Sequence, residues 1–284
     1  MPLNKACVGK CYPPVTTEVS REAIEKYARA YNDDNPAFFD VKRPGGIVAP
    51  PLFGVVVTWP SLVQAVGDSE LQVDLLRLLH GEQEMEFFNP IRPGDKITSN
   101  AKIASIQTKP SGETLAIELE ASGHNREPKV RVIFGAFIRT GGSRKTGDNE
   151  QDMAKAERGA ALVTVSQQID ADQTFRYAAA SGDHNPIHVD ETVAKMAGLR
   201  GIIVHGLCTM AFTSKVMIDK LCGGDPTRLK RLRVRFVRPV FPGQTITTKV
   251  WQESEGNGRR LYAYETCNPE GRAVIRGGIA EVAI

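Results

Sequence analysis

Alternating apolar and polar positions predict antiparallel strands in both parts of the chain. In the stretch 229–237, Leu232, Val234 and Phe236 fall on one face of an extended backbone, and Arg233 and Arg235 fall on the other. Similar runs predict strands at 83–89, 96–107, 114–122 and 129–139, and at 229–237, 244–253, 260–267 and 273–282. Short helices are predicted at 21–30 and 171–181, and longer apolar helices at 52–66 and 207–221. Helices followed by a run of strands indicate an α+β fold.

The same order of elements occurs twice. Residues 27–40 and 177–190 are identical at seven of fourteen positions, at an offset of 150. Residues 46–50 resemble 201–205, and residues 88–95 resemble 237–244. Because three matches occur in the same order at a period near 150, the chain is interpreted as a duplicated domain, since solenoid repeats are far shorter.

A polar, glycine-rich stretch separates the two copies. The segment 140–152 has no aromatic residue and is typical of an exposed linker. We therefore predict an N-terminal domain at 1–139, a linker at 140–158 and a C-terminal domain at 159–284. A long surface loop within one domain is the alternative, which the repeat on either side disfavours.

Composition excludes several classes of protein. The net charge of +3 is too small to suggest a nucleic-acid partner, and no apolar stretch approaches the roughly eighteen residues that a membrane span requires. The five cysteines are scattered, which favours a reducing compartment and gives little support for a metal site. With neither a secretory signal at the start nor a peroxisomal Ser-Lys-Leu signal at the end, we expect a cytoplasmic protein.

Candidate acid–base chemistry lies in the second copy. Asp183 and His188 are separated by a turn that contains Asn185-Pro186, and such a turn can direct both side chains into one pocket. A carboxylate and an imidazole placed there can share a water molecule, and imidazole exchanges protons near neutral pH. The plainer alternative is that Asp183 only caps the turn and His188 is a surface residue.

A second candidate is the start of the long helix near 207. The first N–H groups of a helix are unpaired and lie at the positive end of its dipole. Gly206 has no side chain that would block a substrate oxygen from its N–H. The alternative is a glycine needed only for close packing.

The stretch 177–190, followed by Gly201-Ile-Ile-Val-His-Gly-Leu207, resembles the signature of the MaoC-like or hydratase 2 family of (R)-specific enoyl-thioester hydratases. The resemblance implies a double hot dog fold, in which each long helix is wrapped by an antiparallel sheet and the two copies imitate the usual homodimer. It also implies that Asp183 and His188 are the catalytic pair, that Asn185 holds the turn, and that the Gly206 N–H binds the thioester oxygen. His205 is then pocket-shaping, and Ser214 is at most supporting.

The first copy lacks the same chemistry. Asp33 matches Asp183, but Phe38 stands in the place of His188, and Ala49-Pro50 is aligned with His205-Gly206. Phenylalanine cannot exchange a proton and proline has no N–H. We therefore expect the first copy to hold the acyl chain, lined by Phe38, Phe39, Phe53 and Trp59, unless these are ordinary core aromatics.

The basic run 230–238 is a candidate for the phosphates of coenzyme A or of an acyl-carrier-protein arm. Arg233 and Arg235 are its central members, and a solvated sheet face is the alternative.

Three functions remain open at this stage. The first is hydration of trans-2-enoyl thioesters, or dehydration of (R)-3-hydroxyacyl thioesters, at one site per chain. The others are a hot-dog thioesterase and a non-catalytic acyl-thioester-binding protein. No metal or redox cofactor is expected, because acid–base groups and an oxyanion site suffice for hydration. The chain is expected to be an internal pseudo-dimer, with a homodimer of it left open.

Overall fold

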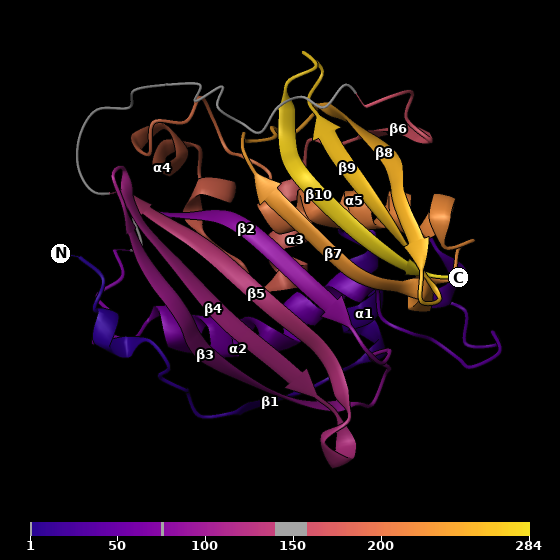
Figure 1. Ribbon diagram of the computed structural model, residues 1–284, viewed down its shortest axis with the longest axis horizontal. Coiled ribbons are helices and arrows are strands. Elements are labelled where there is room, and N and C mark those ends of the chain that lie inside the picture. Colours follow the sequence, from indigo (N-terminus) through magenta and orange to yellow (C-terminus); the bar gives the residue numbers. More distant parts are fainter. Residues whose placement is uncertain (1, 75–76, 140–157) are drawn as a thin grey trace.

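The computed structural model describes residues 2–74, 77–139 and 158–284 and has two halves of the same design (Figure 1). Each half contains a short strand, a short helix, a long helix and four longer strands. The first half consists of β1(Val15–Glu18), α1(Arg21–Arg29), α2(Gly54–Val66), β2(Leu78–Phe87), β3(Lys96–Lys109), β4(Gly112–Ser122) and β5(Pro128–Arg139). The second consists of β6(Val163–Gln168), α3(Gln173–Ser181), α4(Glu191–Met196), α5(Gly206–Leu221), β7(Leu229–Phe236), β8(Thr245–Gly256), β9(Arg259–Cys267) and β10(Ala273–Ala283).

The ten strands form one continuous sheet in the order β1-β3-β4-β5-β2-β7-β10-β9-β8-β6. All neighbours are antiparallel, and the order reads as two copies of one five-strand pattern joined through β2 and β7. At this junction Glu84 pairs with Arg233, and these two residues occupy equivalent positions in the repeat. The pair therefore marks a pseudo-twofold axis of the molecule.

Each long helix lies against the concave face of its own part of the sheet (Figure 1). Helix α5 is apolar on most sides, and eleven of its sixteen residues are buried. A helix that is hydrophobic around most of its surface is stable only when it is enclosed, which explains why the sheet wraps it. The double hot dog and α+β predictions are confirmed by this architecture.

The short helices α1 and α3 meet at the same axis. The hydroxyl of Tyr27 lies 3.0 Å from that of Tyr177, its own counterpart in the repeat, and both rings are fully buried. The ring centroids are 5.6 Å apart. Contacts between equivalent residues are those expected of a covalent pseudo-dimer.

Some elements were not predicted from the sequence. Strands β1 and β6 are short edge strands, and their polar composition hides the period-two pattern. Helix α4 has only six residues and is capped by Asp190, whose carboxylate accepts from the N–H groups of Thr192 and Val193. The predicted linker at 140–158 lies outside the described residues except for Arg158, so the domain boundaries stay predictions.

Among the described residues, no helix is both long and apolar enough to cross a membrane. The cytoplasmic location remains a prediction.

Candidate active site

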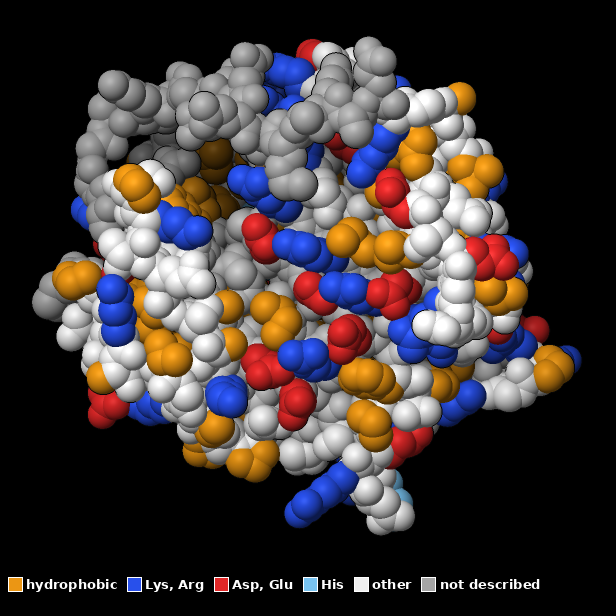
Figure 2. Space-filling view, in the orientation of Figure 1, with side chains coloured by type: hydrophobic (Ala, Val, Ile, Leu, Met, Phe, Trp, Pro, Cys, Tyr) orange, Lys and Arg blue, Asp and Glu red, His pale blue; other side chains and the backbone are white. Residues whose placement is uncertain are grey.

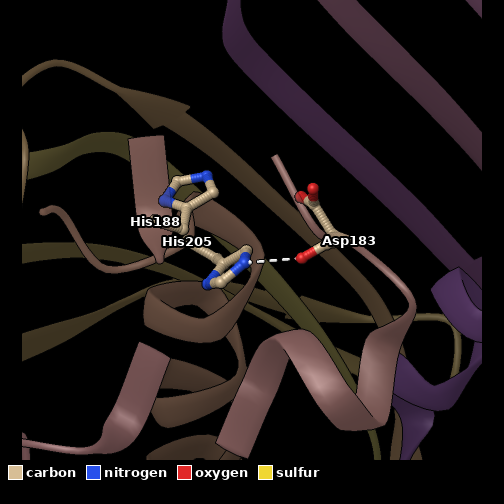
Figure 3. A group of neighbouring side chains, drawn as sticks. All are labelled: Asp183, His188 and His205. Carbon is tan, nitrogen blue, oxygen red and sulfur yellow. Dashed lines mark hydrogen bonds between the residues drawn. The ribbon is translucent and has the colours of Figure 1, made fainter. Parts of the chain in front are cut away.

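The Asp183–His188 turn follows the end of helix α3. Gly182 adopts the left-handed conformation with φ of 81°, which ends the helix. The Asp183 carboxylate then accepts from the N–H of Asn185 at 3.1 Å, and the Asn185 side-chain oxygen accepts from the N–H of Ile187 at 3.3 Å. These two bonds close a compact turn, in which one carboxylate oxygen of Asp183 is an acceptor. The same carboxylate projects beside the His188 ring (Figure 3).

His188 is buried and has a defined tautomer. Its Nδ1–H donates to the carbonyl oxygen of Ile203 at 2.7 Å, so the lone pair is on Nε2. Burial lowers the pKa of His188, although the bond to Ile203 and the charge of Asp183 oppose this. The imidazole is therefore neutral near pH 7, and Nε2 can accept a proton. Its ring and the Asp183 carboxylate project to the same side (Figure 3).

His205 contacts both His188 and the backbone of Asp183. Its ring stacks on that of His188 with centroids 3.8 Å apart, and its Nε2–H donates to the backbone carbonyl of Asp183 at 3.0 Å. Tyr177 also packs against His205, with ring centroids 5.1 Å apart. Burial, followed by the proximity of His188, lowers the pKa of His205 to about 3. A ring that is neutral near pH 7 connects the turn to helix α5 in this place.

Gly206 is the first residue of α5 and lies directly after His205. Among the hydrogen bonds of the described residues, none is made by its N–H, as expected at a helix N-terminus. A Cβ atom on Gly206 would come within 3.2 to 3.3 Å of the Phe236 ring. The position therefore has room for a backbone donor and little room for a side chain.

The same cluster has the composition of a metal site. Ligand atoms of Asp183, His188 and His205 lie within 4.8 Å of one another. However, the His205 nitrogen that faces Asp183 carries a proton, because it donates to a carbonyl oxygen. The other nitrogen, Nδ1, is buried without a hydrogen-bond partner and is directed away from Asp183 (Figure 3). This donor set fits acid–base chemistry better than metal coordination.

The remaining predicted residues of the second half differ in their exposure to solvent. Asn185 is exposed and acts within the turn. The Ser214 hydroxyl is buried in α5 and has no partner among the described residues. His184 is exposed, as expected.

Arg233 and Arg235 are carried on the outer face of the sheet, opposite the face that packs on the helices. Arg233 pairs with Glu82 at 3.3 Å and lies 3.9 Å from Glu84. Figure 2 shows acidic and basic side chains alternating over this central part of the sheet. The structure thus gives Arg233 carboxylate partners within the protein rather than a place beside the candidate active site.

The first half has a different version of the site. Phe38 occupies the position of His188 and is fully buried, and Phe53 is 1% exposed and packs edge-on against Tyr27 at 5.7 Å. These contacts favour ordinary core aromatics over lining of an open space. Trp59 differs, because it lies 3.5 Å from the position that a Cβ atom of Gly182 would take, next to Asp183.

The alignment of the helix starts needs a correction of one residue. Equivalent backbone bonds are Ala49 N to Ile91 O and Val204 N to Val240 O, each 2.8 Å. Ala49 is therefore the counterpart of Val204, and Pro50-Pro51, not Ala49-Pro50, stands opposite His205-Gly206. The match of residues 46–50 with 201–205 already gives this pairing, and the earlier alignment of Ala49-Pro50 departed from it by one residue. The inference itself holds, since Pro51 also lacks an N–H.

Sequence reasoning missed His80, which β2 of the first half brings toward the site. Its ring centroid lies 5.0 Å from that of Phe236 and 4.4 Å from that of Phe134. Burial lowers the pKa of His80 to about 4, and His188 is close enough to contribute to the same direction. No sequence signal could place His80 here, because its position depends on the pairing of β2 with β7 across the two halves.

Fold and candidate site together indicate a class: double hot dog proteins in which an Asp and a His converge beside a helix N-terminus. Residues 153–271 match the family model for the MaoC like domain, and residues 6–131 match that for the FAS1-like dehydratase domain region. The chain is 32% identical to probable enoyl-CoA hydratase 2 of Dictyostelium discoideum, over 97% of this chain and 95% of that protein. The chain belongs to the MaoC-like enoyl-CoA hydratase 2 family.

Two further relatives support this membership. The 3-hydroxyacyl-thioester dehydratase Y of Mycobacterium tuberculosis is 30% identical over 73% of this chain and 72% of that protein. A crystal structure of a MaoC-like dehydratase from Phytophthora capsici superposes with a TM-score of 0.81 at 27% identity, over 99% of this chain and 98% of that one.

Proposed function

We propose that the protein adds water to the double bond of trans-2-enoyl thioesters to give (R)-3-hydroxyacyl thioesters, and catalyses the reverse dehydration. The observation that carries the proposal is the convergence of Asp183 and the neutral His188 beside the N-terminus of α5. The names of the relatives, which include a hydratase and a dehydratase, support both directions of the same reaction.

In this proposal each group has a role. Water held between the Asp183 carboxylate and His188 Nε2 gives up a proton as its oxygen bonds to the β-carbon. The pair delivers a proton to the α-carbon, so it regains its starting state after each turnover. The Gly206 N–H donates to the thioester oxygen as this oxygen gains enolate charge, and such a donor contributes roughly 2.7–4 kcal/mol of transition-state stabilisation.

His205 and the first half position these groups. His205 holds the turn through the Asp183 carbonyl and fixes the plane of His188 by stacking. Trp59 reaches the same turn from α2, so the first half contributes to the walls around the acyl group. The first half offers no second site of this kind, because Phe38 and Pro51 replace the proton carrier and the backbone donor.

The experiment is hydration of crotonyl-CoA, followed by loss of its conjugated absorbance, with the stereochemistry of the product determined by chiral separation. The unchanged protein should form the (R)-3-hydroxy product, and Asp183→Asn and His188→Gln should each lower turnover by about 10²–10⁴-fold. His184→Gln, on the exposed neighbour in the same turn, is the matched control and should retain activity. Release of free thiol without loss of the double bond would instead establish a thioesterase.

A further inference from the structure

The junction between the two halves carries opposite charges on its two strands. Across it, Glu82 pairs with Arg235, Glu84 with Arg233 and Glu86 with Arg231. We call these six residues the seam charges. They lie on the outer face of the sheet, where they form the alternating acidic and basic pattern in the middle of Figure 2.

Four of these residues, Glu82, Glu84, Arg231 and Arg233, form ion pairs between the halves. Arg231 contacts Glu84 at 2.7 Å, with both side chains about three-quarters buried, at 28% and 25% exposure. Arg233 contacts Glu82 at 3.3 Å. Within the described parts of the chain, every ion pair found for Glu82, Glu84 and Arg233 crosses the junction.

The repeat places each acidic seam residue at the position of a basic one. An offset of 149 makes Glu82 the counterpart of Arg231, Glu84 of Arg233, and Glu86 of Arg235. If two first halves paired through β2, Glu84 would therefore face Glu84, and Glu82 would face Glu86. If two second halves paired through β7, three arginine pairs would result. Like charges directly opposite in a sheet are destabilising.

We infer that the seam charges allow each half to pair only with the unlike half. The inner face of the seam carries no charge that could make this choice, because Met85 and Leu232 are apolar and fully buried and the buried Gln83, opposite Val234, is uncharged. Selection therefore falls to the outer face, where charge differs between the halves. A second copy of this chain can enter the seam only by a reciprocal exchange of unlike halves, as in domain swapping.

Two full-length chains test the inference. The basic-seam chain carries Glu82→Arg, Glu84→Arg and Glu86→Arg, and the acidic-seam chain carries Arg231→Glu, Arg233→Glu and Arg235→Glu. Each alone places like charges across its seam, so its Tm should fall by about 2–8 °C. When the two chains are unfolded and refolded together, exchange of halves restores opposite charges at both seams. Light scattering should then show a species of twice the mass, which melts above either chain alone.

A matched control uses an ion pair within one half. Arg260 and Glu255 are 2.7 Å apart on neighbouring strands of the second half, at exposures of 38% and 47%. Chains with Glu255→Arg and Arg260→Glu should stay monomeric when mixed, because exchange of halves cannot reunite opposite charges there. A seam mixture that stays monomeric, or a control mixture that dimerises equally, overturns the inference.

A further variant tests the inference even if the two seam variants fold poorly. One chain carrying all six seam substitutions restores opposite charges within itself, so it should fold as a monomer and melt above both parent variants. High salt should reduce this difference, because partly exposed charges are screened. If the six-substitution chain is no more stable than its parents, seam charge does not select the partner.

Discussion

Asp33, the first-half counterpart of catalytic candidate Asp183, is bound by Lys215 of the second half at 3.3 Å. Its side chain is 1% exposed, and Lys215 also reaches Asp34 and Asp219. Burial raises the pKa of Asp33, while the lysine opposes the shift. The residue that could act on water in one half has thus become part of a structural ion pair between the halves.

Replacing Asp33 should therefore affect stability and spare the chemistry. Asp33→Asn keeps the shape but removes a buried charge from Lys215, which should destabilise the fold by about 1–3 kcal/mol. Turnover of crotonyl-CoA at 20 °C should be retained, whereas Asp183→Asn should nearly abolish it. Urea unfolding and initial rates on the same preparations separate the two effects. Equal loss of turnover in both variants would place Asp33 in the catalytic machinery.

Much of the architecture follows from sequence because it depends on local patterns and on the repeat. Alternation in 229–237 predicts β7 to within a residue, and the repeated Asp-x-Asn-Pro motif predicts both turns. The contacts of Arg233 and His80 could not be predicted in this way. Both depend on the register of β2 against β7, which joins residues about 150 positions apart and is set by packing of the whole sheet.

The space around Gly206 leads to a second prediction. Gly206→Ala places a methyl group 3.2 Å from the Phe236 ring and crowds the approach to the N–H, so kcat should fall by about 10²–10³-fold. Gly54→Ala is the matched control, because a Cβ atom there would meet Met85 and Val130 at 3.0 to 3.1 Å in the first half. It should lower Tm to a similar degree with kcat retained. Similar losses of kcat in both would mean that packing, and not the N–H, accounts for the effect.

The ion pairs of Arg233 argue for a third prediction. If Arg233 serves the seam, Arg233→Gln should lower Tm by a few degrees at most and leave the KM for crotonyl-CoA unchanged, because partly exposed pairs contribute roughly 0.2–1 kcal/mol. If it bound a phosphate of coenzyme A, KM should rise in the variant, and the KM of the unchanged protein should be more sensitive to ionic strength. Steady-state kinetics at low and high salt distinguish these roles.

The neutral state of His205 predicts how stability depends on pH. Its pKa lies at about 3 in the folded protein and near the ordinary value of 6.5 in the unfolded chain. The unfolded chain therefore binds a proton that the folded one does not, so stability is complete above about pH 6.5 and is lost progressively as pH falls toward 3. Each such group contributes a slope of about 1.4 kcal/mol per pH unit within that window.

Removing the imidazole should reduce this slope. In His205→Gln, the free energy of unfolding measured with urea should be lower at pH 7 but should fall less steeply between pH 6 and pH 4 than in the unchanged protein. Some dependence should persist, because His80, with its pKa lowered to about 4, titrates in the same window. Identical slopes in His205→Gln and the unchanged protein would show that His205 is already protonated in the folded state, and the carbonyl-bound neutral ring would then be the wrong description of the site.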